Sequence, residues 1–125
     1  MLLEINTHSQ KPIYEQLRDQ IVLGIATKQL VHGEAMPSVR NLAADLGINF
    51  HTVNKAYSML RYEGYLIMDR RKGAVVAPML TNNEVFFAKL SLSLSLSAAE
   101  AVCHSVGESE FLELCAGCYR NATAG

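Results

Sequence analysis

The chain has 125 residues, of which 50% are hydrophobic and 18% are charged, and its formal net charge is −1. This length suits one domain with a short appendage, and the composition excludes wholesale disorder because it can supply a packed core. Residues 1–78 carry nine Lys or Arg against seven Asp or Glu, whereas residues 79–125 carry two against five. Phosphates would repel the acidic tail, so we expect it to face away from any DNA.

The first residues have neither the basic start nor the long apolar stretch of a signal peptide. No uninterrupted apolar run reaches the roughly 18 residues that a bilayer span requires. We therefore expect a cytoplasmic protein without a membrane partner. In that compartment Cys103, Cys115 and Cys118 would be reduced thiols.

Pro12 begins a predicted helix at about 12–29, because proline lacks the N–H that would be unpaired in the first turn anyway. An apolar residue follows at every fourth position and forms one stripe along this helix, at Ile13, Leu17, Ile21 and Ile25. Gly33 and Pro37 interrupt the chain after it.

Two helices joined by a tight turn come next. Ser38 caps a predicted helix over about 38–46, and Asn49 caps a second one over about 49–63. A glycine follows each helix, as is common at left-handed C-terminal positions. The apolar residues expected to face the core are Leu42, Ala43, Leu46, Val53, Ala56, Tyr57 and Leu60.

Residues 65–68 and 74–77 are β-prone runs separated by the charged sequence 69–73, which predicts a two-stranded hairpin. Two helices with a tight turn, followed by a basic hairpin, are typical of a winged helix-turn-helix. In such a fold the second helix of the pair enters the major groove, and the hairpin tip reaches phosphates or the minor groove. The predicted fold class is mostly α, with this DNA-binding domain at residues 10–78.

The periodicity of the 49–63 helix selects the polar residues that face away from the core. Asn54 can form a bidentate pair with adenine, and Lys55 can contact phosphate or guanine. Arg40 is placed to contact the DNA backbone, although an ion pair with Asp45 is the alternative. The candidate DNA-binding residues on these grounds are Arg40, His51, Thr52, Asn54, Lys55, Arg70, Arg71, Lys72 and Gly73.

The segment after Pro78 has two interpretations. Leucine and serine alternate over residues 90–96, which is typical of a strand. However, Asn82 or Asn83 can cap a helix, and the apolar residues also fit the helical period. We favour a long helix at about 82–105, followed by a helix at about 108–121. A helix that is apolar on two sides is usually buried on both.

Several motifs together resemble one known family. They are Met36-Pro37-Ser38-Val39-Arg40-Asn41-Leu42-Ala43, Gly47-Ile48-Asn49, Thr52 to Leu60, Glu63-Gly64-Tyr65-Leu66, and Pro12 to Leu17. Over about residues 10–78 the chain resembles the DNA-binding domain of GntR-type bacterial repressors. The resemblance implies DNA contacts from Ser38 and Arg40 in the motif begun by Pro37, from Gly73 in the wing, and from the first half of the recognition helix at Asn49, His51, Thr52, Asn54 and Lys55. Some members carry an arginine where this chain has Phe50.

Most GntR-type proteins have a large C-terminal effector domain, and residues 79–125 are too few for one. The chain therefore resembles the short YtrA-like branch, whose tail is two helices used for dimerisation. The resemblance implies a homodimeric repressor that binds an inverted-repeat operator in double-stranded DNA. The residues that would form the dimer contact are Phe87, Leu90, Leu94, Phe111 and Leu114.

Four other hypotheses remain open or are disfavoured. Cys115 and Cys118 form a CxxC motif, with Cys103 and His104 nearby in sequence, so a metal- or thiol-redox-sensing regulator is the alternative to simple packing of small side chains. A winged helix used only for protein contacts is disfavoured by the clustered basic residues. We find no catalytic constellation, so neither enzyme activity nor a cofactor or metal is expected. A small-molecule effector stays open, with the cleft between the winged domains and the dimerisation helices as its one candidate site.

Overall fold

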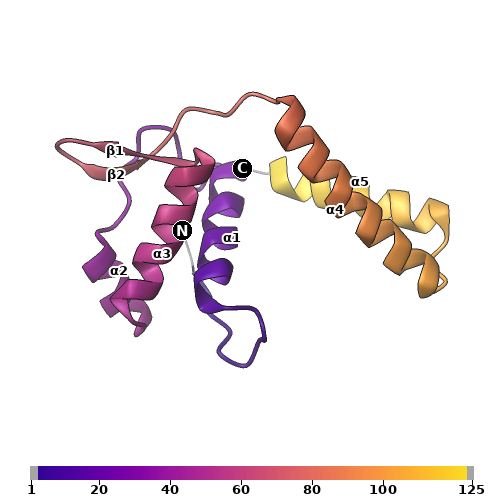
Figure 1. The fold of residues 1–125 in the computed structure, drawn as a ribbon, viewed down its shortest axis with the longest axis horizontal. Helices are drawn as coiled ribbons and strands as arrows, with labels where there is room; N and C mark the ends of the chain where they lie inside the picture. Colours follow the sequence, from indigo (N-terminus) through magenta and orange to yellow (C-terminus); the bar gives the residue numbers. More distant parts are fainter. Residues whose placement is uncertain (1–2, 124–125) are drawn as a thin grey trace. The chain divides into compact units, whose positions relative to one another are not determined.

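The computed structural model describes residues 3–123; residues 124 and 125, which belong to the expected C-terminal segment, and residues 1 and 2 lie outside this range. Within it the chain forms five helices and one two-stranded sheet (Figure 1). The elements are α1 (Ile13–Ala26), α2 (Val39–Leu46), α3 (Phe50–Glu63), β1 (Leu66–Asp69), β2 (Gly73–Val76), α4 (Glu84–Cys103) and α5 (Glu108–Thr123). The mostly helical winged fold is thus confirmed. The chain divides into two compact units, one ending at Leu80 and the other beginning at Thr81.

The helix α3 is the centre of the N-terminal unit. It packs against α1, α2 and β1, and Figure 1 shows α1 and α3 side by side. The core comprises residues from these elements, from β2 and from the loop before α2: Leu17, Ile21, Leu30, Met36, Leu42, Ala43, Val53, Ala56, Tyr57, Leu60, Leu66 and Val76. The predicted apolar faces of α2 and α3 are therefore correct, except that Leu46 is only half-buried.

The limits of α2 and α3 follow from local capping. The Ser38 hydroxyl accepts a hydrogen bond from the Asn41 N–H at 3.1 Å, and the Asn49 side chain accepts one from the His51 N–H at 2.8 Å. Each cap satisfies a backbone donor that the helix itself leaves unpaired, which stabilises the helix by about 1 kcal/mol. Gly47 ends α2 in the left-handed conformation at φ 67°. The predicted bounds of both helices are confirmed.

The helix α1 is shorter than predicted. It ends at Ala26 rather than near residue 29, because Thr27 caps it and Lys28 adopts a left-handed φ of 65°. The Leu30 N–H then donates to the Gly24 carbonyl at 3.0 Å, and the turn buries the Leu30 side chain in the core. Neither glycine nor proline marks this turn in the sequence, so the apolar periodicity alone predicts a helix that ends too late.

The hairpin that forms the wing is attached at its base. Its strands pair antiparallel from Leu66 with Val76 to Asp69 with Gly73, so each strand is offset by one residue from the predicted runs. The loop before α2 runs along the other edge of β2. The Met36 N–H donates to the Ala74 carbonyl at 2.8 Å, and the Val76 N–H donates to the Glu34 carbonyl at 2.9 Å. Two short strands alone are marginally stable, and this third segment supports them.

An ion pair joins α1 to the C-terminal end of α3. The Arg18 guanidinium donates two hydrogen bonds to the Glu63 carboxylate, each 2.9 Å long, and lies 5.5 Å from the centroid of the Tyr65 ring. The hydrogen bonds to Glu63 raise the pKa of Arg18 despite its partial burial. Bidentate pairs of this kind add geometric specificity, so Arg18 fixes where α3 ends relative to α1.

The C-terminal unit is helical, which settles the choice between strand and helix over residues 90–96. The Asn83 side chain caps α4 by accepting from the Phe86 N–H at 2.8 Å. The Ser95 hydroxyl donates to the Ser91 carbonyl one turn earlier at 2.9 Å, so a serine-rich segment remains helical. Neither α4 nor α5 has a fully buried residue.

Among the described helices, α4 alone is long enough and apolar enough to cross a membrane, with a mean hydropathy of 1.4. This result rests on length and composition only. Serines interrupt every run of leucines in α4, which is why the sequence showed no uninterrupted apolar span. By this criterion the expectation that no segment could span a bilayer does not hold for α4.

We predict that Leu60→Ala destabilises the protein by about 2–5 kcal/mol, because Leu60 is fully buried and its truncation leaves a cavity. The matched control is Leu23→Ala on α1, where the side chain is 54% exposed and the expected change is within about 0.5 kcal/mol. Urea unfolding of the full chain, followed by circular dichroism, measures both. Equal losses for the two variants would contradict the assigned core.

Candidate nucleic-acid interface

The face of α3 that points away from the core carries polar side chains. His51, Asn54 and Lys55 are exposed, as the periodicity predicted, and Thr52 is half-buried on the flank. Because the opposite face is fully packed, α3 cannot rotate to hide these groups. The N-terminal half of α3 therefore presents a donor- and acceptor-rich surface of the kind that reads base edges in a major groove.

The Arg40 side chain lies at the start of α3. Its guanidinium carbon is 5.4 Å from the centroid of the Phe50 ring, and the Phe50 and His51 rings are 4.4 Å apart at an angle of 45°. The alternative of an ion pair with Asp45 is not observed among the described residues. A cation over an aromatic face is stabilised by about 0.5–1 kcal/mol at exposed sites, which holds the charge of Arg40 beside the recognition helix.

Lys55 is held in a similar way on the other side of α3. Its ammonium nitrogen lies 4.0 Å from the centroid of the Tyr14 ring, in the first turn of α1. Positions 50 and 55 are about 140° apart around a helix axis. Arg40 and Lys55 thus place one positive charge on each side of α3. The sequence did not predict either aromatic partner, because Tyr14 comes from a distant segment and Phe50 has no polar group.

An open cleft of about 290 Å³ lies between the start of α2, the side of α3 and the wing. Asn54, Arg61, Met68 and Lys72 are among its lining residues. Arg61 was not among the predicted contacts, although it follows Asn54 by seven residues and so lies on the same helical stripe. Helical periodicity extended to the end of α3 would have identified it.

The tip of the wing is basic and ordered by one carboxylate. Arg70, Arg71 and Lys72 are exposed. The Asp69 carboxylate accepts from the backbone N–H groups of Arg71 at 2.8 Å and Lys72 at 3.0 Å. These hydrogen bonds, first that from Lys72, lower the pKa of Asp69. Gly73 follows with a positive φ of 77°, a backbone conformation that residues other than glycine rarely adopt.

Tyr57 links the recognition helix to the segment that begins α2. The residue is 4% exposed, and its hydroxyl donates to the Pro37 carbonyl at 2.8 Å. Burial raises the pKa of Tyr57 to about 12. Since Pro37 precedes the capping residue Ser38, this hydrogen bond sets the position of α2 and, with it, of Arg40.

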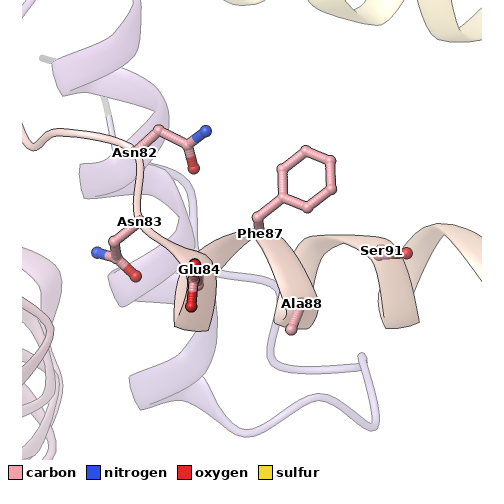
Figure 2. Close-up of a pocket in the computed structure, with 6 residues that line it drawn as sticks. All are labelled: Asn82, Asn83, Glu84, Phe87, Ala88 and Ser91. Atoms are coloured by element: carbon pink, nitrogen blue, oxygen red, sulfur yellow. The ribbon is translucent and has the colours of Figure 1, made fainter.

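The predicted dimerisation residues lie in the C-terminal unit, and four of the five are exposed. Phe87 is 59% exposed, Leu94 48% and Leu114 63%, while Leu90 is exposed and Phe111 half-buried. At the N-terminal end of α4 an open groove of about 490 Å³ includes Phe87, whose ring projects away from the helix (Figure 2). The apolar side chains of this unit therefore have no covering layer of their own.

The three cysteines are free thiols in the C-terminal unit; Cys115 is half-buried, and Cys103 and Cys118 are exposed. Within residues 3–123 no group of three or more His, Cys, Asp or Glu side chains could hold a metal ion.

Comparison with known proteins assigns the N-terminal unit. The family of bacterial regulatory proteins known as gntR matches residues 10–76. The chain belongs to the GntR family. The match spans α1 to β2, the winged helix-turn-helix unit that carries the motifs around Arg40 and Lys55.

Individual GntR-family relatives and structures agree with this assignment. The chain is 34% identical to the repressor YtrA of Bacillus subtilis over 76 residues, which cover 61% of this chain and 58% of that protein. It spans about half the length of the curated relatives it matches first. YtrA from Sulfolobus acidocaldarius has a TM-score of 0.68 at 34% identity, covering 79% of this chain and 99% of that one. A transcriptional antiterminator from Listeria monocytogenes has a TM-score of 0.92 at 28% identity, covering 100% and 95%.

We predict that Tyr57→Phe lowers the free energy of unfolding by about 1 kcal/mol at neutral pH, because one buried hydrogen bond is lost. The folded-state pKa of about 12 lies above the ordinary value of 10.0, so the protonated phenol stabilises the fold fully below pH 10. That stability is lost as the pH rises toward 12. Urea unfolding at several pH values should show the wild type losing stability relative to Tyr57→Phe above pH 10, and parallel curves would contradict this.

Proposed function

We propose that the protein is a homodimeric, cytoplasmic transcription repressor that binds an inverted-repeat DNA operator through two copies of its winged domain. The observation that carries this proposal is the exposed polar face of α3, flanked by Arg40 on one side and Lys55 on the other. Membership of the GntR family supports it.

The DNA contacts divide by chemistry. His51, Thr52 and Asn54 lie in the first two turns of α3, where a recognition helix meets base edges. Arg40 and Lys55 flank the helix and face the phosphates of the two groove walls. Both cations are already held over aromatic rings, so less side-chain entropy is lost when DNA binds. The basic wing tip adds contacts to the backbone or to the adjacent minor groove.

The dimer is proposed because the C-terminal unit has no core of its own. Large apolar side chains lie exposed along α4 and α5, and contiguous apolar surface of this kind marks an interaction site. A second copy of the same chain would cover it in a two-fold arrangement. Lys89, Ser93 and Glu100 share one polar stripe along α4, which fits an interface with one solvent-facing side rather than a lipid surround.

Repression is proposed from the relative in Bacillus subtilis that is named a repressor. A dimer bound across a promoter would exclude the polymerase by occupying the same DNA.

Selection from a random duplex pool tests sequence-specific binding. We expect enrichment of a two-fold symmetric site whose half-sites lie about one helical turn apart. Enrichment of no sequence above a salt-sensitive background would contradict the proposal.

We predict that Arg40→Ala and Lys55→Ala each weaken binding to the selected site and each reduce the salt slope, log K against log salt, by about 1. The matched control is Lys28→Gln, which removes a positive charge at the opposite end of α1 from Tyr14 and should leave the slope unchanged. Fluorescence anisotropy at several salt concentrations measures all three. An unchanged slope for Arg40→Ala or Lys55→Ala would remove that residue from the interface.

We predict that Leu94→Glu converts the dimer to a monomer, because it places a charge in the proposed apolar contact. The control is Ser93→Glu, which adds the same charge to the polar stripe of α4 and should remain dimeric. Sedimentation velocity distinguishes the two species. A wild type that sediments as a monomer would contradict the proposed assembly.

A further inference from the structure

We infer that Phe50 reads the 5-methyl group of a thymine in the operator, and that it thereby determines part of the DNA sequence preference. This inference rests on the proposed DNA-binding function. It assigns a role in base readout to an apolar residue that was not among the DNA-binding residues predicted from the sequence.

Phe50 occupies the first position of α3, directly after the capping residue Asn49, and its side chain is 38% exposed. It is the one aromatic residue exposed beside the polar cluster of Arg40, His51 and Asn54 within the described chain. In the folded domain the exposed part of the ring stays in contact with water, so covering it on binding would be favourable. At the N-terminal end of a recognition helix, that surface lies where base edges are contacted.

The ring is held in place by its two neighbours. The Arg40 guanidinium lies 5.4 Å from its centroid, and the His51 ring is 4.4 Å from it. These contacts restrict the ring before DNA binds, so little entropy is lost when it meets an apolar partner. Phe50 is therefore a rigid apolar surface surrounded by polar groups.

The major groove offers few apolar partners. Its edges present hydrogen-bond donors and acceptors, and among unmodified bases the thymine methyl is the apolar exception. Phe50 and Asn54 lie one helical turn apart on the same stripe, so their side chains reach neighbouring base pairs. We therefore expect the thymine to lie within one or two base pairs of the adenine that pairs with Asn54.

Replacing thymine by deoxyuridine tests this directly, because it removes the methyl group and leaves base pairing intact. Each thymine of the selected half-site is replaced in turn, and affinities are measured by anisotropy for the wild type, Phe50→Ala and Tyr62→Ala. Tyr62 is the matched control, since it is an exposed aromatic residue at the other end of α3, with 93% of its surface accessible. Circular dichroism verifies that each variant is folded.

One replacement should weaken the wild type and Tyr62→Ala about fourfold, the value of one buried methyl group, and should weaken Phe50→Ala less than twofold. The inference is overturned if no replacement matters for the wild type, or if Phe50→Ala is as sensitive as the wild type. A wild type that binds its selected site with no such sensitivity contradicts only this inference. A wild type that selects no sequence contradicts the proposed function as well.

Discussion

The burial of one face of α3 is the constraint on which the rest of the structure depends. Val53, Ala56 and Leu60 have no exposed surface, because α1 and α2 close over them. This packing leaves the helix one orientation, with its polar residues outward. The groups around it are then placed by their own elements: Arg40 by α2, and the wing by the strand that follows α3. The packing of the core thus fixes which side chains α3 exposes. A helix that could rotate would present no defined set of side chains to DNA.

The C-terminal unit presents the opposite situation. Its helix α4 is capped by Asn83, yet none of the described residues of α4 or α5 is fully buried. Helix formation in water depends mainly on packing of an apolar face, so α4 and α5 need an apolar partner surface from outside their own unit. A second copy would complete the fold and would also join two winged domains. In this account dimerisation is part of folding, and the spacing of the half-sites follows from it.

Local signals made much of the fold predictable. Ser38, Asn49 and Gly47 determine the limits of α2 and α3 through hydrogen bonds and backbone conformations that depend only on neighbouring residues. The predicted end of α1 was wrong because Lys28 adopts a left-handed conformation. Burial of Leu30 in the core favours that conformation. The stacking of Arg40 on Phe50 and of Lys55 on Tyr14 joins separate helices. Such contacts depend on packing distances that no local pattern contains, so the cations were predictable and their partners were not.

The most direct test compares binding to a complete inverted repeat with binding to one isolated half-site. If two winged domains are joined by their C-terminal helices, the wild type should bind the complete repeat about a hundredfold or more tightly than the half-site, because the second contact becomes intramolecular. The Leu94→Glu monomer should bind both DNA fragments with similar affinity. Equal affinity of the wild type for the two fragments would contradict the account.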